Sequence, residues 1–476
     1  MAVKDWQVVI GLEVHAQLSS KTKMFSSDST EFGQEVNKNT SPTSLGLPGA
    51  LPTINKKAVE LGVKMGLALN CNIRKNFTFS RKNYFYPDLP KAYQISQHTD
   101  PVCEKGYLEI FFNGEFKKIA IERAHLEEDA GKSLHKQGAT LVDFNRSGVP
   151  LLEIVSEAVL TSPKEAAEYS RQMRQLLIYT EVCDGNLQEG SMRCDCNISL
   201  CKPGEPWGTK VEIKNINSFK FIEKALEYEI KRQAKALESG ETIIQETRLY
   251  DVKNNVTVEM RKKEDAHDYR YFPDPDLLPV NLTDKEINSC KESLTELPMQ
   301  KIKRFIKDYK LKAEDAFLIA QDKKFADFFE QVATKSKNFK LSYNFMMGDV
   351  LKYMNEEKKE VGALIFSSSQ LAELISLVDT EVISGKIAKS VFLDMTKNGK
   401  NPLTIVEEKS LKQITNEAEI LNFIKESLKN FDKQLQDYKN GQVKLFGFFV
   451  GEAMKASKGK INPALLNKLL KKYLDE

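Results

Sequence analysis

The chain has 476 residues, which is enough for about three domains of roughly 150 residues each. Hydrophobic residues make up 41% and charged residues 29%, which excludes a disordered chain, and the net charge of +3 means that any nucleic-acid binding must depend on local basic surfaces. The first residues lack the pattern of a signal peptide, and no apolar run approaches the length of a membrane span. We therefore expect a cytoplasmic protein that does not bind membranes.

The first predicted strand, residues 8–18 (VVIGLEVHAQL), carries a carboxylate and an imidazole on one face. Side chains alternate along a strand, so Glu13 and His15 share a face. The other face carries the apolar residues of the stretch: Ile10, Leu12, Val14, Ala16 and Leu18. The polar face is either a solvated surface or part of a functional site.

The next distinctive segment, residues 80–94 (SRKNYFYPDLPKAYQ), interleaves basic and aromatic residues. Such a segment suits stacking on unpaired bases and contact with phosphates. The candidate nucleic-acid-binding residues in it are Arg81, Lys82, Tyr84, Tyr86, Lys91 and Tyr93. The alternative is a loop, interrupted by prolines, whose tyrosines pack against one another.

Four later stretches add acids and bases to alternating strands: 119–132 (IAIERAHLEEDAGK), 149–157 (VPLLEIVSE), 190–200 (GSMRCDCNISL) and 209–215 (TKVEIKN). The clean alternation predicts an antiparallel sheet with one face on the core. Carboxylates with an imidazole suit Mg²⁺ or Mn²⁺, and basic residues between them suit phosphate. Together they favour a site that holds a nucleoside triphosphate through a metal ion, although no P-loop signature is present.

Helices are predicted between and after these strands. SPKE at 162–165 predicts a capped helix with Ser162 as N-cap and Glu165 completing a capping box, and a second helix should follow Asn217 or Ser218 and end near Gly240. From about residue 295 strand signals vanish, and NGKNPLT at 398–404 is expected to link two helical parts. The fold class is therefore α+β, with an antiparallel-sheet domain followed by helical domains.

The last predicted helix has one apolar stripe, formed by Leu465, Leu466, Leu469, Leu470, Tyr473 and Leu474. Just before it, MKASKGK (454–460) contains Lys455, Lys458 and Lys460. These lysines either bind the RNA backbone or form an ordinary solvated helix end.

Many motifs, taken in order, resemble one family, the B subunit of the heterotrimeric aspartyl/glutamyl-tRNA amidotransferase. They include VIGLEVH, HLEEDAGKS, VDFNRSGVPLLEIVSE, EGSMRCDCNIS, KVEIKNINSF, QETRLYD, DYRYFPDPDLLPV and GFFVGEAMKASKGKINPALLNKLL. The resemblance covers nearly the whole chain. It implies a cradle-shaped catalytic domain at 1–293, a helical domain at 294–406 and a tRNA-binding tail domain at 407–476.

The resemblance also implies an activity. The family's subunit uses ATP to phosphorylate the side-chain carboxylate of Glu on tRNA(Gln), of Asp on tRNA(Asn), or of both. Ammonia, made from glutamine by an amidase A subunit, then displaces the phosphate, and a small C subunit braces the heterotrimer. The implied cofactors are ATP and Mg²⁺, with Mn²⁺ as the possible substitute.

The site residues follow from the same resemblance. His15, Glu128 and Glu153 match one cation site, and Glu13, Asp195 and Glu212 match a second group in the same pocket. Among Glu127, Glu128 and Asp129, alternation alone does not choose the ligand. The expected catalytic residues are Glu13, His15, Glu128 and Glu153, and the expected ATP-binding residues are Arg123, Arg193, Lys210 and Lys214.

One departure from the family and two rival interpretations complete the analysis. Ser26, Ser27, Ser41 and Ser44 stand where many relatives carry cysteines, so we expect no zinc. One rival is a non-catalytic scaffold for tRNA, which should not concentrate carboxylates in its cleft. The other is the archaeal relative specific for Glu-tRNA(Gln), but the chain is too short for that relative's inserted domain.

Overall fold

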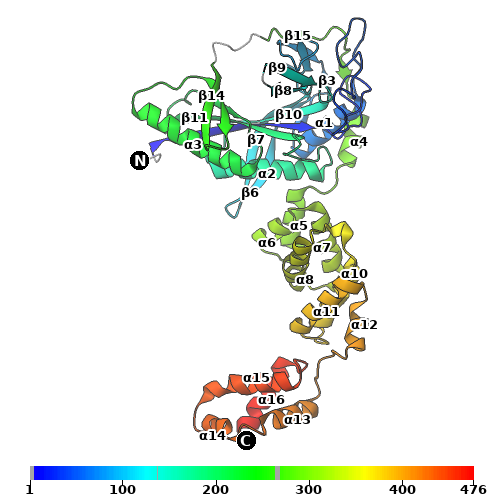
Figure 1. The fold of residues 1–476 in the computed structure, drawn as a ribbon, viewed down its shortest axis with the longest axis vertical. Helices are drawn as coiled ribbons and strands as arrows, with labels where there is room; N and C mark the ends of the chain where they lie inside the picture. The colour runs from blue at the N-terminus through cyan, green and yellow to red at the C-terminus, as the bar shows by residue number, and fades with distance from the viewer. Residues whose placement is uncertain (1–4, 137, 263–268, 476) are drawn as a thin grey trace. The chain divides into compact units, whose positions relative to one another are not determined.

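The computed structural model describes residues 5–136, 138–262 and 269–475 (Figure 1). Asp268, the first residue of the DYRYFPDPDLLPV motif, lies outside these described residues. The chain divides into two compact units, one ending at Lys301 and the other beginning at Ile302. The first unit contains a large sheet and the second is helical, so the predicted α+β class is confirmed.

A nine-stranded sheet organises the described part of the first unit, in the order β14-β13-β12-β11-β1-β10-β7-β6-β2. Its strands are β1 (Gln7–Gln17), β2 (Asn72–Ile73), β6 (Cys103–Phe112), β7 (Glu115–Glu128), β10 (Pro150–Ser156), β11 (Met192–Cys201), β12 (Val211–Lys214), β13 (Glu246–Asp251) and β14 (Val256–Lys262). Neighbouring strands are antiparallel, as predicted, except that β12 and β13 are parallel. The exception arises because α3 (Phe219–Glu238) connects these two strands, and a helical crossover is the usual connection between parallel neighbours.

Helices cover the apolar face of this sheet. α1 (Lys56–Ala68) packs on β6 and β7, α2 (Pro163–Tyr179) on β1 and β6, and α3 on β11 (Figure 1). The predicted inward residues of the first strand, of which Leu18 lies just beyond the end of β1, are all buried in this core: Ile10, Leu12, Val14, Ala16 and Leu18. Burial of each large apolar side chain contributes roughly 1.5–3 kcal/mol, and a slip of one residue would turn this face outward. The core therefore fixes which side chains of β1 lie on the polar face.

Both predicted helix starts are confirmed. The Ser162 hydroxyl accepts the backbone N–H of Glu165 at 3.2 Å at the start of α2, and Ser218 accepts that of Phe221 at 3.2 Å at the start of α3. The capping box predicted at Glu165 differs in its partner. The Oε2 atom of Glu165 accepts a hydrogen bond from the backbone N–H of Thr161 at 2.8 Å, and its Oε1 atom pairs with the Lys117 ammonium.

Smaller sheets and one helix surround the large sheet. They are a three-stranded sheet of β15 (Phe272–Pro273), β4 (Ser80–Asn83) and β5 (Tyr93–Ser96), and the pairs β3 (Asn76–Phe77) with β16 (Val280–Asn281) and β8 (Lys132–Lys136) with β9 (Ala139–Asp143). α4 (Asp284–Glu292) packs on α1. β5 contacts β7, which brings the basic and aromatic segment to the acids at the end of β7.

The described residues after β16 form no strand, as predicted. The helices are α5 (Pro298–Tyr309), α6 (Ala313–Ile319), α7 (Lys323–Ser336), α8 (Phe339–Phe345), a π-helical turn (Met346–Val350), α9 (Leu351–Glu357), α10 (Ser368–Asp379), α11 (Gly385–Asn398), α12 (Pro402–Glu408), α13 (Glu417–Leu428), α14 (Asp432–Lys439), α15 (Phe446–Ala456) and α16 (Pro463–Asp475), with short 3₁₀ turns at Val361–Ala363 and Val443–Leu445. The stretch at 398–404 joins α11 to α12, but it does not separate two helical parts, because α12 begins at Pro402 and packs against α10 and α11.

The end of the chain has a separate apolar core made by α13, α15 and α16. The predicted stripe of α16 is confirmed: Leu466, Leu469, Leu470 and Leu474 are buried, and Leu465 and Tyr473 pack against them. Within the described residues, no helix combines the length and the apolar character that crossing a membrane requires.

Candidate functional site

The strand register places the polar residues in a row across four adjacent strands. His15 of β1 lies opposite Glu153 of β10 and also opposite Arg193 of β11. Glu153 lies opposite His125 of β7, and Glu13 lies opposite a second acid, Asp195. Directly opposed residues share a face of the sheet, so these side chains form one continuous polar surface.

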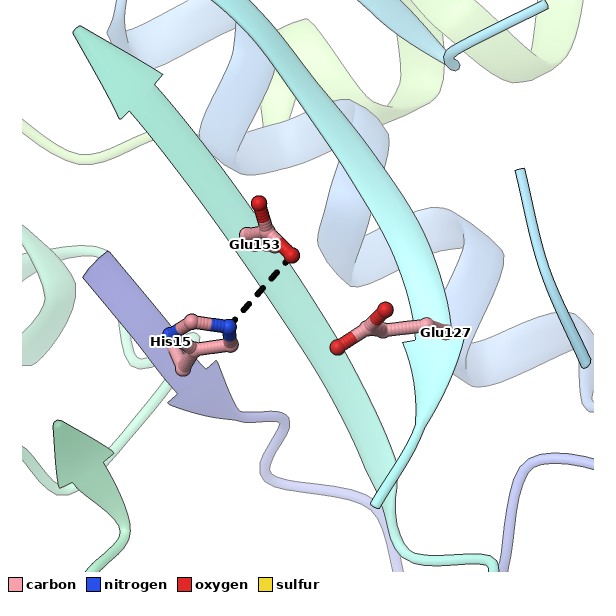
Figure 2. A group of neighbouring side chains, drawn as sticks. All are labelled: His15, Glu127 and Glu153. Carbon is pink, nitrogen blue, oxygen red and sulfur yellow. Dashed lines mark ion pairs between the residues drawn. The ribbon is translucent and has the colours of Figure 1, made fainter. Parts of the chain in front are cut away.

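Three residues of this row form what we call the first acidic group: His15, Glu127 and Glu153. They come from β1, β7 and β10, and one potential ligand atom of each lies within 4.8 Å of the others (Figure 2). The Nε2 atom of His15 is 3.3 Å from Oε2 of Glu153. One imidazole and two carboxylates are a donor set that suits a hard or borderline divalent cation.

Mutual attraction shapes the charges of this group. Burial disfavours a charged imidazole, but the Glu153 carboxylate, with help from Asp195 and Glu127, raises the pKa of His15 to about 9. Burial likewise disfavours a charged Glu153, but His125, His15 and Lys82 together hold the pKa of that carboxyl well below its usual range. The group therefore keeps an ionised carboxylate beside a readily protonated imidazole.

The second acidic group consists of Glu13, Asp195 and Glu212, whose ligand atoms also lie within 4.8 Å of one another. The ammonium of Lys214 donates to Asp195 at 2.7 Å and lies 2.8 Å from a carboxylate oxygen of Glu212. Burial and the charges of Glu153 and Glu212 raise the pKa of Glu13, although its hydrogen bond from Asn197 opposes this. Both groups lie on the same face of the sheet, because Glu13 and His15 are two residues apart on β1.

The structure differs from the expected position of Glu128. Glu127, and not Glu128, lies beside His15 and Glu153. Glu128 is the next residue along β7, so its side chain points to the opposite face of the strand. It is buried against the Lys91 ammonium, and its carboxylate accepts a hydrogen bond from the backbone N–H of Ile95 at 2.9 Å. The missed signal was the spacing from His125, because residues two apart on β7 share a face.

Sequence reasoning also missed His125 as a member of this site. Its Nε2 atom is 3.5 Å from Oε2 of Glu153 and 3.7 Å from Oε2 of Glu127. Its buried Nδ1 atom has no hydrogen-bond partner among the described residues. The alternation of Arg123, His125 and Glu127 along one predicted strand is the signal that could have identified it.

The four predicted ATP-binding residues are in different environments. The guanidinium of Arg193 donates to Asp129 at 3.0 Å on the polar face, and Lys214 is held by the second acidic group. Arg123 donates to Glu122 at 2.6 Å and lines a cavity of about 520 Å³ that also includes His125 and Glu153. Lys210 is exposed just before β12, and its charge is a minor contribution to the lowered pKa of Glu212 in the second acidic group.

The cations of the predicted tRNA-binding segment make intramolecular contacts. Arg81 donates to Asp274 at 2.9 Å and to Asp276 at 2.8 Å, and Lys91 pairs with Glu128. Lys82 is 4.9 Å from the centre of the Tyr269 ring. These cations are therefore turned toward the protein and not toward solvent.

The tyrosines of the same segment pack locally, as the alternative interpretation expected. The ring centres of Tyr84 and Tyr86 are 6.0 Å apart, and Tyr84 is equally close to Tyr269. Tyr86 remains exposed. In the tail, Lys455 and Lys458 are exposed at the end of α15, and Lys460 is half-buried.

The serines at the expected cysteine positions surround a carboxylate. Ser26 and Ser41 donate to Oδ2 of Asp28 at 3.1 Å and 2.9 Å, and Ser44 donates to the same atom. Ser27 is exposed and does not take part. Hydroxyls around one carboxylate form a different donor set from the thiolates and imidazoles of structural zinc sites.

Comparison with known proteins places the chain in a family. A family model described as "GatB/GatE catalytic domain" matches residues 8–288, and one described as "GatB domain" matches residues 327–474. A protein of Bdellovibrio bacteriovorus is 52% identical over 472 residues, which cover 99% of each chain. One of Thermodesulfovibrio yellowstonii is 52% identical over 474 residues, which cover 99% of this chain and 100% of its own. Both are named as the B subunit of aspartyl/glutamyl-tRNA(Asn/Gln) amidotransferase. As its motifs predicted, the chain belongs to the family formed by the B subunits of aspartyl/glutamyl-tRNA(Asn/Gln) amidotransferases.

Proposed function

We propose that this chain is the subunit of a tRNA-dependent amidotransferase in which the misacylated aminoacyl group is activated and amidated. The reaction is an ATP-dependent carbon–nitrogen ligation that converts Glu-tRNA(Gln) to Gln-tRNA(Gln), Asp-tRNA(Asn) to Asn-tRNA(Asn), or both. The observation that carries the proposal is the pair of acidic groups on one sheet face, in a chain whose relatives carry that enzyme's name.

The residues present fit a divalent cation. His15, Glu127 and Glu153 would hold one Mg²⁺ or Mn²⁺ ion, and Glu13 with Asp195 and Glu212 would form the second group. Their hard oxygen and imidazole donors, and the buried His125 Nδ1 atom without a partner among the described residues, support this assignment. A bound cation would neutralise the charges of the triphosphate and of the carboxylate that approaches it.

The chemistry has two steps. In the first, an oxygen of the Glu or Asp side chain attacks the γ-phosphorus of ATP, the bond to the β-phosphate breaks, and ADP leaves. In the second, ammonia attacks the carbon of the acyl phosphate, loses a proton, and expels inorganic phosphate. The chain's own groups hold the reactants in register on the polar face, and Arg193 and Lys214 supply fixed positive charge there.

Partners supply the remaining parts of the reaction. We assign glutamine hydrolysis to an amidase A subunit, and bracing of the heterotrimer to a small C subunit. The exposed lysines at the end of α15 are the residues we propose for tRNA contact, together with Tyr86, because Arg81, Lys82 and Lys91 already have partners within the chain. The domain ranges 1–293, 294–406 and 407–476 stay part of this proposal.

Supplying free ammonia tests the proposal without the glutaminase. The complex carrying Glu153→Gln should make less than about a hundredth of the amidated tRNA made by wild type with ammonia, Mg-ATP and misacylated tRNA, because an active-site charge interaction is lost. Its tRNA affinity and basal glutaminase activity should persist. Glu157→Gln, an exposed acid four residues along the chain, is the matched control.

Near wild-type amidation by the Glu153→Gln complex would show that activation happens elsewhere. The non-catalytic scaffold would then be the better interpretation. Loss of tRNA binding together with amidation would instead indicate a general folding defect, which the free energy of unfolding of the variant measures directly.

A further inference from the structure

The QETRLYD motif at 245–251 supplies no member of either acidic group, but one of its side chains touches the second group. Residues 246–251 form β13, which returns after α3 and runs parallel to β12. In this pairing Thr247 lies directly opposite Glu212, so the two side chains are on the same face of the sheet. The motif therefore places a hydroxyl beside one of the three acids of the second group.

The carboxylate of Glu212 is held at both of its oxygens. The Thr247 hydroxyl donates to Oε2 at 2.8 Å, and Oε1 lies 2.8 Å from the ammonium of Lys214. Among the described residues, no other group donates to Oε2. Thr247 is buried, and branching at its Cβ restricts the rotation of its side chain. Its hydroxyl therefore has a fixed direction, which in turn fixes the orientation of the Glu212 carboxylate.

β13 is itself anchored to α3 by buried charges. The neighbours of Thr247 along the strand, Glu246 and Arg248, have side chains on the opposite face. There Arg248 donates to Glu246 at 2.8 Å and lies 3.6 Å from Glu229 of α3. The fully buried Glu229 also accepts a hydrogen bond from the hydroxyl of Thr257, on β14, at 2.8 Å. This network ties the strand to the helix, so it determines where Thr247 lies beside the acids.

A buried hydroxyl needs a partner, so the hydrogen bond from Thr247 also has a purely structural explanation. The surroundings of Glu212 favour a functional one. Its ligand atom lies within 4.8 Å of those of Glu13 and Asp195, so a rotation of its carboxylate changes the spacing of the whole group. Hydrogen bonds orient the carboxylates of metal sites, and the loss of one typically costs about 10- to 100-fold in metal affinity or activity.

We propose that Thr247 is a positioning residue for the amidation reaction, whose hydroxyl orients Glu212 so that the second acidic group presents a fixed set of oxygen atoms to a cation. The inference rests on the proposed function of that group. Glu246 and Arg248 contribute indirectly, because they hold β13 against α3. The motif thus combines an anchor on one face of the strand with a positioning hydroxyl on the other.

Thr247→Val tests the proposal, because it removes the hydroxyl and keeps the shape of the side chain. In the intact complex with free ammonia, Mg-ATP and misacylated tRNA, kcat should fall about 10- to 100-fold. KM for the tRNA should change less than about 2-fold, because Glu212 acts on the reaction and not on tRNA binding. Thr247→Ser, which keeps the hydroxyl, should restore most of kcat.

Thr257→Val is the matched control. It makes the same substitution and removes a threonine hydroxyl that donates to a buried glutamate, but Glu229 belongs to neither acidic group. This variant should lower the free energy of unfolding in urea and leave kcat within about 2-fold of wild type. A double-mutant cycle gives a second check: in the Glu212→Gln background, Thr247→Val should change kcat less than about 2-fold, because its effect passes through Glu212.

Binding of Mn²⁺ without substrates is a readout that needs no amidation. It is measured in the Glu153→Gln background, which weakens the first acidic group so that the second dominates the titration. There Thr247→Val should raise the dissociation constant about 10-fold, and Thr257→Val should change it less than about 2-fold.

Equal losses of kcat in Thr247→Val and Thr247→Ser, or an undiminished loss in the Glu212→Gln background, would show that Thr247 serves the fold alone and would overturn the proposal. No loss of kcat, or no Mn²⁺ binding in the Glu153→Gln background, would overturn it as well. If wild type makes no amidated tRNA while Mn²⁺ binding follows the expected pattern, the proposed function fails and the positioning role of Thr247 stands.

Discussion

Glu127 and Glu128 are adjacent carboxylates for which the structure predicts opposite consequences of the same substitution. The Glu127 carboxylate lies with His15 and Glu153, with ligand atoms within 4.8 Å of one another. Two unit charges about 4 Å apart interact by about 4 kcal/mol at an effective dielectric constant near 20. Water that replaces the carboxylate recovers part of this energy, so Glu127→Gln should cost about 2–3 kcal/mol of cation binding. This corresponds to a roughly 30- to 150-fold higher dissociation constant for Mn²⁺.

Glu128→Gln should instead destabilise the fold and leave Mn²⁺ binding nearly unchanged. Its partner Lys91 has a side chain only 8% exposed, so the substitution leaves an ammonium buried without its counter-charge. Removing one member of a buried ion pair costs about 3–5 kcal/mol. The free energy of unfolding should fall by that amount in Glu128→Gln and change much less in Glu127→Gln.

Both quantities can be measured on the same preparations. Titration with Mn²⁺, followed by the electron paramagnetic resonance signal of the free ion, gives the dissociation constant, and unfolding in urea gives stability. Glu115→Gln, at the exposed start of β7, is the control for loss of an acid. If Glu128→Gln loses Mn²⁺ binding and Glu127→Gln keeps it, then Glu128 is the ligand. The argument from the alternation of side chains along β7 is then refuted.

Two further predictions concern stability and tRNA binding. Burial lowers the pKa of Lys23 to about 8, although Asp28 and Glu128 act to raise it. Between pH 8 and about 10.4, the unfolded chain therefore binds more protons than the folded chain does. The free energy of unfolding of wild type relative to Lys23→Met should rise over this interval by on the order of 2 kcal/mol, and a flat difference would contradict the burial argument. Removal of residues 414–476, which have their own core, should weaken tRNA binding. Replacing Lys455, Lys458 and Lys460 by Gln should reduce the slope of the logarithm of the tRNA binding constant against the logarithm of the salt concentration by about 2–3. Unchanged affinity after the truncation would refute the assignment of the tail.

Local patterns were sufficient to predict the faces of the first strand and the starts of two helices. Alternation on β1 identified which residues enter the core, since burial on one face is decided within a few residues of sequence. The N-cap Ser162 was equally readable and that of α3 was narrowed to Asn217 or Ser218, because a cap bonds to a backbone group three residues away. The parallel pairing of β12 and β13 could not be predicted from local patterns, because pairing after a helical crossover depends on where the returning strand docks.

Partners that are distant in sequence explain why the predicted tRNA-binding cations and Glu128 lie in environments that the sequence did not indicate. Lys91 approaches Glu128 from 37 residues upstream, and Arg81 meets Asp274 from 193 residues away. Composition showed basic and aromatic residues together, but it contained no information about acids that would neutralise them in the fold. A basic segment predicts a surface for nucleic acid only when its charges lack such partners, and here the long-range contacts decide otherwise.

The arrangement of charges also bears on whether the polar face of the sheet is only a solvated surface. Acids on an ordinary wet face are exposed and separated, since like charges close together oppose folding. Here Glu127 is only 4% exposed, and the nearby charges of Glu153 and Glu212 add to burial in raising the pKa of Glu13. Such a cluster reduces stability unless a cation balances it, and in the second acidic group three carboxylates share the ammonium of Lys214. The cost is understandable if the face binds cations during function, which a scaffold for an anionic tRNA would not require.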